Sequence, residues 1–123
     1  MASCVIGPCL QWTWICFLRT MAASVAIGNW DGYWGNHNNY YLYFDEDEGR
    51  LYFIEYDFDN SLGTCLDDFG GNKGLSSVYD YSNHAAPLVD RLLAVPEFRR
   101  QYTDYLIELM SENNDYFAYS SSF

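Results

Sequence analysis

The chain has 123 residues, of which 50% are hydrophobic, and this is enough for one small domain with its own core. Its 17 acidic residues against 6 basic ones give a formal net charge of −11. A surface this acidic repels the phosphates of nucleic acids and of anionic membranes. We therefore exclude DNA or RNA binding and attachment to an anionic membrane surface.

The N-terminal segment contains an apolar run from Val5 to Leu18 that superficially resembles a leader sequence. No positive charge precedes the run, Pro8 interrupts it and Arg19 follows it. It is also too short and interrupted for a membrane span. The four cysteines, at positions 4, 9, 16 and 65, match no zinc-binding pattern, and we expect free thiols.

The first predicted element is a mostly buried helix over residues 15–27, with Gly28 as its stop. A loop rich in Gly, Asn and Trp follows over residues 28–39. Aromatic and apolar runs over 40–44 and 51–58 then flank a charged tip. Because glycine suits positive φ, Gly49 in this tip favours a β-hairpin.

The second half predicts a long irregular loop over residues 60–86 and then two helices, each opened by a proline. The first begins at Pro87 and extends to Ala94, and the second begins at Pro96 and fades near residue 112. Its apolar stripe comprises Phe98, Tyr102, Tyr105, Leu106 and Leu109. The order of helix, loop, hairpin, long loop and helix pair predicts the α+β class.

Three carboxylates, Glu55, Asp57 and Asp59, occupy alternate positions of the second predicted strand. Alternate side chains of a strand share one face, and crowded acids repel one another unless a cation lies among them. The pattern therefore predicts a divalent metal site. A calcium loop starting at Asp57 is the rival interpretation, but its sixth position is Leu62 rather than glycine.

A second pattern precedes the hairpin, where Asp31 lies five residues before Asn36. Protein kinases have the same separation between a catalytic-loop Asp and a metal-binding Asn, followed by a further metal-binding Asp. Here Asp31, Asn36, the hairpin and Asp57 occur in that order. Phosphoryl transfer needs one carboxylate near the nucleophile and others holding metal on the phosphates, which is the chemistry this order permits.

Three blocks resemble the CotH (spore coat protein H) kinase family. They are GNWDGYWGNHNNYYLY at 28–43, GRLYFIEYDFDNSLG at 49–63 and PLVDRLLAVPEFR at 87–99. The resemblance implies a protein-kinase-like fold, with ATP and Mg²⁺ or Mn²⁺ used to phosphorylate Ser or Thr of a protein substrate. It also implies a spore-associated or cell-surface setting. By the same resemblance Asp31 is catalytic, and Asn36, Asp57 and Asp59 bind metal.

The resemblance covers residues 17–112, leaving a divergent segment over 1–16 and a tail over 113–123 that we expect to be frayed. Two departures stand out. The family usually has Pro where this chain has Glu55, and no phosphate-binding Lys precedes the site, because Lys73 follows it. We therefore expect part of a C-terminal kinase lobe, without a recognisable N-terminal lobe.

Other interpretations remain open from the sequence. One is a non-catalytic carbohydrate or surface-binding module that uses exposed Trp30, Tyr33 and Trp34, and another is an inactive kinase remnant. Asn38 and Asn39 are interpreted as turn formers. The acidic tip over residues 45–48 is interpreted as a solvated turn.

Overall fold

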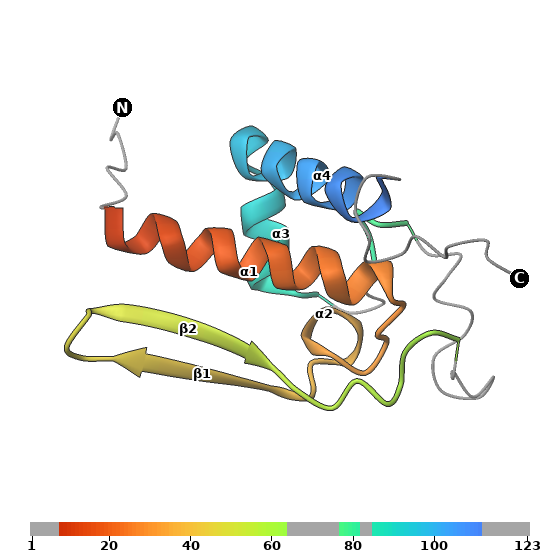
Figure 1. Ribbon diagram of the computed structural model, residues 1–123, viewed down its shortest axis with the longest axis horizontal. Helices are drawn as coiled ribbons and strands as arrows, with labels where there is room; N and C mark the ends of the chain where they lie inside the picture. Colours follow the sequence, from red (N-terminus) through yellow and green to blue (C-terminus); the bar gives the residue numbers. More distant parts are fainter. Residues whose placement is uncertain (1–7, 64–76, 82–84, 112–123) are drawn as a thin grey trace, which may run out of the picture.

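The computed structural model describes residues 8–63, 77–81 and 85–111, and these form helices and one antiparallel hairpin, as the predicted α+β class requires. In Figure 1, helix α1 lies between the hairpin on one side and helix α4 on the other. The elements are α1 (Pro8–Ala26), α2 (Tyr33–Asn36), β1 (Tyr40–Asp45), β2 (Arg50–Glu55), α3 (Pro87–Leu93) and α4 (Pro96–Met110). Within the described residues, no helix combines the length and apolar character needed to cross a bilayer.

Helix α1 begins at Pro8, seven residues before the predicted start at residue 15. Proline is well suited to a first helical position, and no further proline or glycine interrupts the helix. The helix ends at Ala26, and Gly28, the predicted stop, follows with a φ of +69°. Gly28 N–H donates to Val25 O and Asn29 N–H donates to Ser24 O, which together form a Schellman motif.

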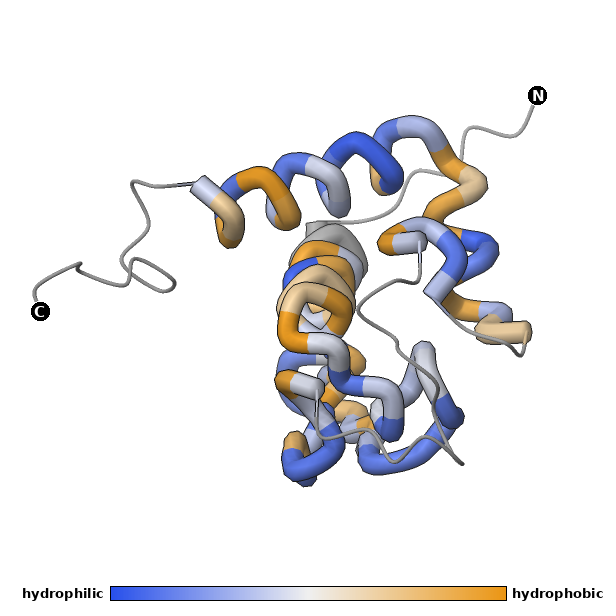
Figure 2. Tube along the Cα trace, turned by 90° about the vertical axis from the view of Figure 1, so that its right-hand side faces the viewer, coloured by the Kyte–Doolittle hydropathy of each residue, from blue (hydrophilic) through white to orange (hydrophobic). Residues whose placement is uncertain are grey.

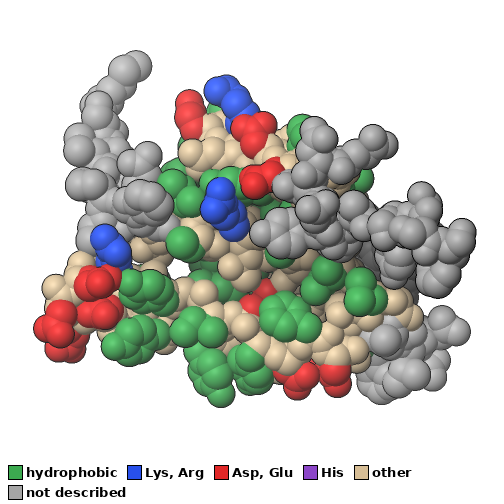
Figure 3. All heavy atoms as spheres, viewed as in Figure 1, with side chains coloured by type: hydrophobic (Ala, Val, Ile, Leu, Met, Phe, Trp, Pro, Cys, Tyr) green, Lys and Arg blue, Asp and Glu red, His purple; other side chains and the backbone are tan. Residues whose placement is uncertain are grey.

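The hairpin pairs Tyr40 with Glu55 and Asp45 with Arg50, and Gly49 adopts a φ of +62° in its turn. The predicted hairpin is therefore confirmed. Its second strand is shorter than predicted, however, because β2 ends at Glu55 rather than at Phe58. Several large apolar side chains of the hairpin are exposed, and Figure 3 shows hydrophobic side chains along it beside the acidic tip.

Both predicted C-terminal helices are confirmed, and each has a proline in its first turn. Figure 2 shows hydrophobic and hydrophilic residues alternating along α4. On its apolar side Tyr102 and Leu106 are buried, while Phe98, Tyr105 and Leu109 pack against the core. Most of the predicted long loop and the whole predicted tail lie outside the described residues.

The core collects apolar side chains from elements far apart in the chain. Helix α1 contributes Phe17, Leu18, Met21, Ala22 and Val25, and the helix pair contributes Val89, Leu92, Leu93, Tyr102 and Leu106. Two aromatic residues of α2, Tyr33 and Trp34, are buried in the same cluster. The short helix that carries them is therefore anchored to the rest of the fold.

Candidate functional site

The predicted catalytic loop contains a helix that the sequence analysis missed. Tyr33–Asn36 form the single turn α2, which ends at His37 in the left-handed conformation with φ +56°. A Cβ on Gly35 would collide with the backbone carbonyl of Trp30, so only glycine fits this close approach. Asp31 lies two residues before this turn, and Asn36 is its last residue.

Asparagine side chains surround Asp31. Asn36 Nδ2 donates to Asp31 Oδ1 at 2.8 Å, and Asn38 Nδ2 lies 3.5 Å from the same oxygen. Asn39 Nδ2 and Asn60 Nδ2 donate to Oδ2 at 3.0 and 3.3 Å. Because all four partners are neutral amide donors, they orient the carboxylate without adding positive charge.

The segment after β2 returns to this loop through backbone hydrogen bonds. Tyr56 N–H donates to Asn39 O at 3.0 Å, and Trp30 N–H donates to Asn60 O at 3.3 Å. Leu62 N–H then donates to Ile27 O at 2.7 Å. The predicted catalytic loop and the predicted metal-binding segment are thus held side by side.

The prediction that Glu55, Asp57 and Asp59 share one strand face is wrong. The strand ends at Glu55, and Asp57 has a φ of +56°, so the extended alternation is lost after the strand. Asp57 and Asp59 are both exposed. A non-glycine residue with positive φ costs free energy, and such conformations concentrate at functional sites.

Glu55 is hydrogen-bonded to other parts of the fold and is partly buried, unlike the two exposed aspartates. Its carboxylate accepts hydrogen bonds from Ser24 Oγ and from Tyr33 N–H, the latter at 3.0 Å. Burial raises the pKa of the Glu55 carboxyl, and these two hydrogen bonds lower it in part. Glu55 is therefore bound within the fold rather than added to a carboxylate cluster.

The donor chemistry of the site suits a hard divalent cation, although its acids are dispersed. Among the described residues, no group of three or more His, Cys, Asp or Glu side chains lies close enough to hold a metal ion. Mg²⁺ commonly uses only one or two carboxylates and completes its shell with water and phosphate oxygens. The carboxylates of Asp57 and Asp59 and the amide oxygen of Asn36 are ligands of that kind.

The aromatic residues around Asp31 do not form the exposed platform of the binding-module interpretation. Tyr33 is 8% exposed and Trp34 is 4% exposed, and both belong to the core. Trp34 packs edge-on against Tyr102 of α4. The interpretation that Tyr33 and Trp34 stack on sugar rings is therefore wrong.

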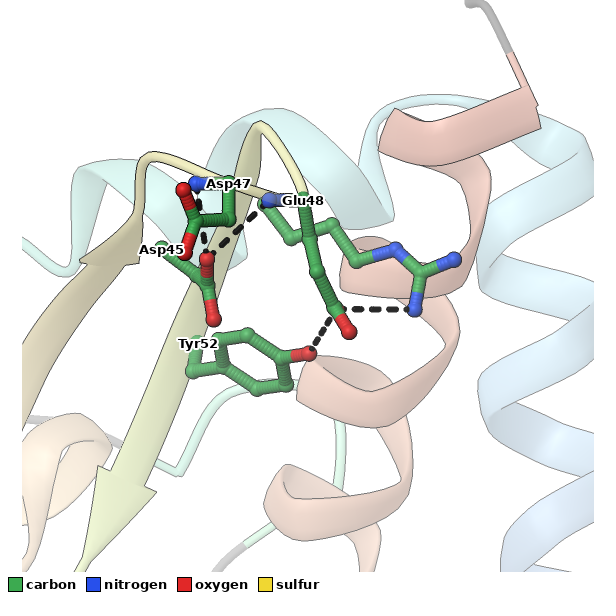
Figure 4. A network of polar contacts seen from close by, with 5 residues as sticks. Asp45, Asp47, Glu48 and Tyr52 are labelled. Carbon is green, nitrogen blue, oxygen red and sulfur yellow. Dashed lines mark hydrogen bonds and ion pairs between the residues drawn. The ribbon is translucent and has the colours of Figure 1, made fainter.

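The acidic hairpin tip is a turn, as predicted, and is stabilised by its own side chains (Figure 4). Asp45 Oδ1 accepts the backbone N–H groups of Asp47 and Glu48, each at 3.0 Å. Glu48 Oε2 pairs with Arg50 at 3.2 Å and accepts the Tyr52 hydroxyl at 2.7 Å. The tip is therefore held by hydrogen bonds and an ion pair between its own neighbouring residues.

Two contributions to the site were missed from the sequence. Asn39 has the positive φ expected of a turn former, but its side chain also orients Asp31. The Ser24–Glu55 hydrogen bond joins residues 31 positions apart. The only sequence signal for the role of Asn39 is the density of asparagines in the loop. The Ser24–Glu55 hydrogen bond has no sequence signal.

The fold and the site together define an α+β domain in which a polar loop and an acidic segment meet beside a hairpin. Comparison with known sequences matches residues 16–120 to the family described as CotH kinase protein. The chain belongs to the CotH kinase family.

Similar curated proteins come from Rhizopus delemar. Spore coat protein homolog 1 is 32% identical over 92 residues, which cover 73% of this chain and 15% of that protein. Invasin CotH3 is 31% identical over 96 residues, or 75% of this chain and 16% of that protein. Invasin CotH2 is 33% identical over 97 residues, which are also 75% of this chain and 16% of that protein. The chain thus spans about one sixth of the length of these relatives.

Proposed function

We propose that this chain forms the catalytic-loop and metal-binding part of the C-terminal lobe of a CotH-type kinase. The reaction is Mg²⁺-dependent transfer of phosphate from ATP to a Ser or Thr hydroxyl of a protein substrate. The observation that carries the proposal is that Asp31 is hydrogen-bonded both to Asn36 and to Asn60 of the acidic segment. Family membership supports the same activity.

In this proposal Asp31 orients the substrate hydroxyl and accepts its proton. The amide donors around the carboxylate fix its direction, and positioning of this kind is the main protein contribution to phosphoryl transfer. Asn36 uses its Nδ2 group on Asp31, which leaves its amide oxygen for a cation. Asp57 supplies the principal carboxylate for the metal, and Asp59 supplies a second.

Phosphate binding also needs positive charge, and the described residues offer little near the loop. The Arg19 guanidinium lies 4.8 Å from the centre of the Tyr105 ring, so it packs toward α4. Lys73 lies outside the described residues. We therefore propose that complete phosphotransfer requires further cationic groups from a longer parent protein.

Calorimetric titration of Mg-ATP into the purified chain tests the proposal. We expect magnesium-dependent binding that Asp57→Ala abolishes and that Asp104→Ala leaves intact. Asp104 is an exposed carboxylate of α4 and is therefore a matched control for charge. If both variants weaken binding equally, the site is not at Asp57. If the cooperatively folded chain does not bind, the proposed function belongs to a longer parent protein and not to this chain alone.

We also propose a spore-coat or cell-surface setting, because similar proteins are described as a spore coat protein homolog and as invasins. Surface labelling of intact spores or cells with a membrane-impermeant reagent tests this setting. We expect the protein in the labelled fraction. Its recovery only after lysis would contradict the proposal.

A further inference from the structure

Glu55 joins three elements around the candidate site. It is the last residue of β2 and pairs with Tyr40 at the start of β1. One carboxylate oxygen accepts Ser24 Oγ near the end of α1, and the other accepts the backbone N–H of Tyr33, the first residue of α2. A single side chain thus connects the hairpin, α1 and the catalytic loop.

Gly32 leaves space for the Glu55 carboxylate because it has no side chain. A Cβ on Gly32 would collide with Glu55 Oε1 and would lie 2.7 Å from Asn29 Nδ2. Asn29 is 1% exposed, and its side-chain amide has no hydrogen-bond partner within the part of the chain that the structure describes. The close approach of the loop to Glu55 therefore depends on glycine at position 32.

The two ends of this connection are each two residues from a proposed functional group. Asp57 follows Glu55 by two positions, and Asp31 precedes Tyr33 by two positions. We propose that Glu55 is a positioning residue that sets the distance between Asp31 and Asp57 by holding the end of β2 against the start of α2. This inference rests on the proposed function, because it assigns Glu55 to the same phosphotransfer site.

Positioning and metal ligation by Glu55 predict opposite results for two conservative variants. Glu55→Gln keeps the length of the side chain and an oxygen that can accept from Tyr33, but it removes the charge. Glu55→Asp keeps the charge but withdraws the carboxylate by one methylene from both donors. A positioning role requires a side chain long enough to reach both donors. The Gln variant should therefore retain metal binding, and the Asp variant should lose it.

The quantity to measure is the affinity of the full chain for Mn²⁺ in the absence of nucleotide. Electron paramagnetic resonance of the free Mn²⁺ gives this affinity. We expect Glu55→Asp and Glu55→Ala to weaken Mn²⁺ binding by about tenfold or more, as is typical when groups that orient metal ligands are removed. Glu55→Gln should stay close to the wild type. Glu46→Ala, at the exposed hairpin tip, controls for loss of one acidic charge.

A second control separates positioning from general stability. Val89→Ala removes buried volume from α3 and should lower the melting temperature without changing Mn²⁺ affinity, because Val89 lies in the core. Amide hydrogen exchange at Tyr33 should accelerate selectively in Glu55→Asp. If Val89→Ala and Glu55→Asp weaken binding to the same extent, Glu55 only stabilises the fold and the inference fails.

The remaining outcomes are also distinct. Loss of affinity in Glu55→Gln with retention in Glu55→Asp would make Glu55 a metal ligand and would overturn the positioning role. Unchanged affinity in Glu55→Asp and Glu55→Ala would overturn that role while the proposed site stands. A folded wild-type chain without Mn²⁺ affinity would overturn the proposed site itself.

Discussion

Asn60 Nδ2 donates to Asp31 Oδ2 at 3.3 Å, although the two residues are 29 positions apart. The Asn60 backbone carbonyl also accepts the N–H of Trp30, the residue before Asp31. The acidic segment therefore contacts the proposed catalytic loop through both side chain and backbone. A shift of either segment changes the surroundings of the Asp31 carboxylate.

Asp31→Asn should destabilise the chain even though the two side chains are similar in size. An amide NH₂ group at this position would face some of the Asn donors that now point at the carboxylate. We expect a loss of about 1–3 kcal/mol in the free energy of unfolding, since donors lose their acceptor. Urea denaturation measures this change.

The matched control is Asp104→Asn on the exposed surface of α4, which should change stability by no more than about 0.5 kcal/mol. Equal effects in the two variants would show that the Asn cluster does not depend on the Asp31 charge.

Replacing glycine in the loop should destabilise the chain more than replacing glycine in the hairpin. Gly35→Ala forces a Cβ onto the Trp30 backbone, which cannot move as a side-chain end could, and we expect a loss of about 3 kcal/mol. Gly49→Ala meets open space and is strained only by its φ of +62°, which should cost about 1 kcal/mol. Thermal unfolding of both variants tests the order, and a larger loss for Gly49→Ala would contradict it.

Tyr102→Phe tests the link between α4 and the segment before α3. The fully buried Tyr102 hydroxyl donates to Val78 O at 2.7 Å, and burial raises the pKa of this hydroxyl so that it stays protonated. Removing it should cost about 1 kcal/mol in the free energy of unfolding. Tyr43→Phe, on the exposed hairpin, is the control and should be neutral in the same urea titration.

The pH dependence of stability should differ between the wild type and Glu55→Gln. Because burial raises the pKa of Glu55 in the folded chain, the folded state holds this proton more tightly than the unfolded state does. Wild-type stability should therefore fall as pH rises from the ordinary value of 4.5 through the raised pKa. Glu55→Gln lacks this decrease.

The measurement is the difference in unfolding free energy between the two proteins at several values from roughly pH 4 to pH 8. Other titrating groups largely cancel in this difference. As pH rises, the unfolding free energy of Glu55→Gln should increase relative to that of the wild type. A constant difference would show that Glu55 has the same pKa in the folded and unfolded states.

The sequence predicted the elements whose ends carry a local signal. Gly28 and Gly49 allow the positive φ that ends α1 and turns the hairpin, and Pro87 and Pro96 open α3 and α4 because proline fixes its own φ. The same logic failed for α2, a single turn stabilised by burial of Tyr33 and Trp34 in a core built by distant elements.

The sequence predicted that Asp31 and Asn36 belong together, but it did not predict how the acidic segment is arranged around them. The spacing of Asp31 and Asn36 identified a pair that the structure joins by a hydrogen bond. The orientation of Glu55 could not be inferred, because alternation along a strand assumes that the strand continues, and β2 ends at that residue. Its partners, Ser24 and Tyr33, are set by tertiary packing rather than by neighbouring sequence.

The packing of α1 against α4 also affects how the chain acquires its structure during synthesis. A nascent chain that has emerged as far as Gly63 contains the hairpin, Asp31 and Asp57, but the helix that covers the other side of α1 is not yet made. Closing such a distant contact costs chain entropy and slows folding. The residues of the candidate site therefore leave the ribosome before α4, and during that interval the side of α1 that later packs against α4 is uncovered.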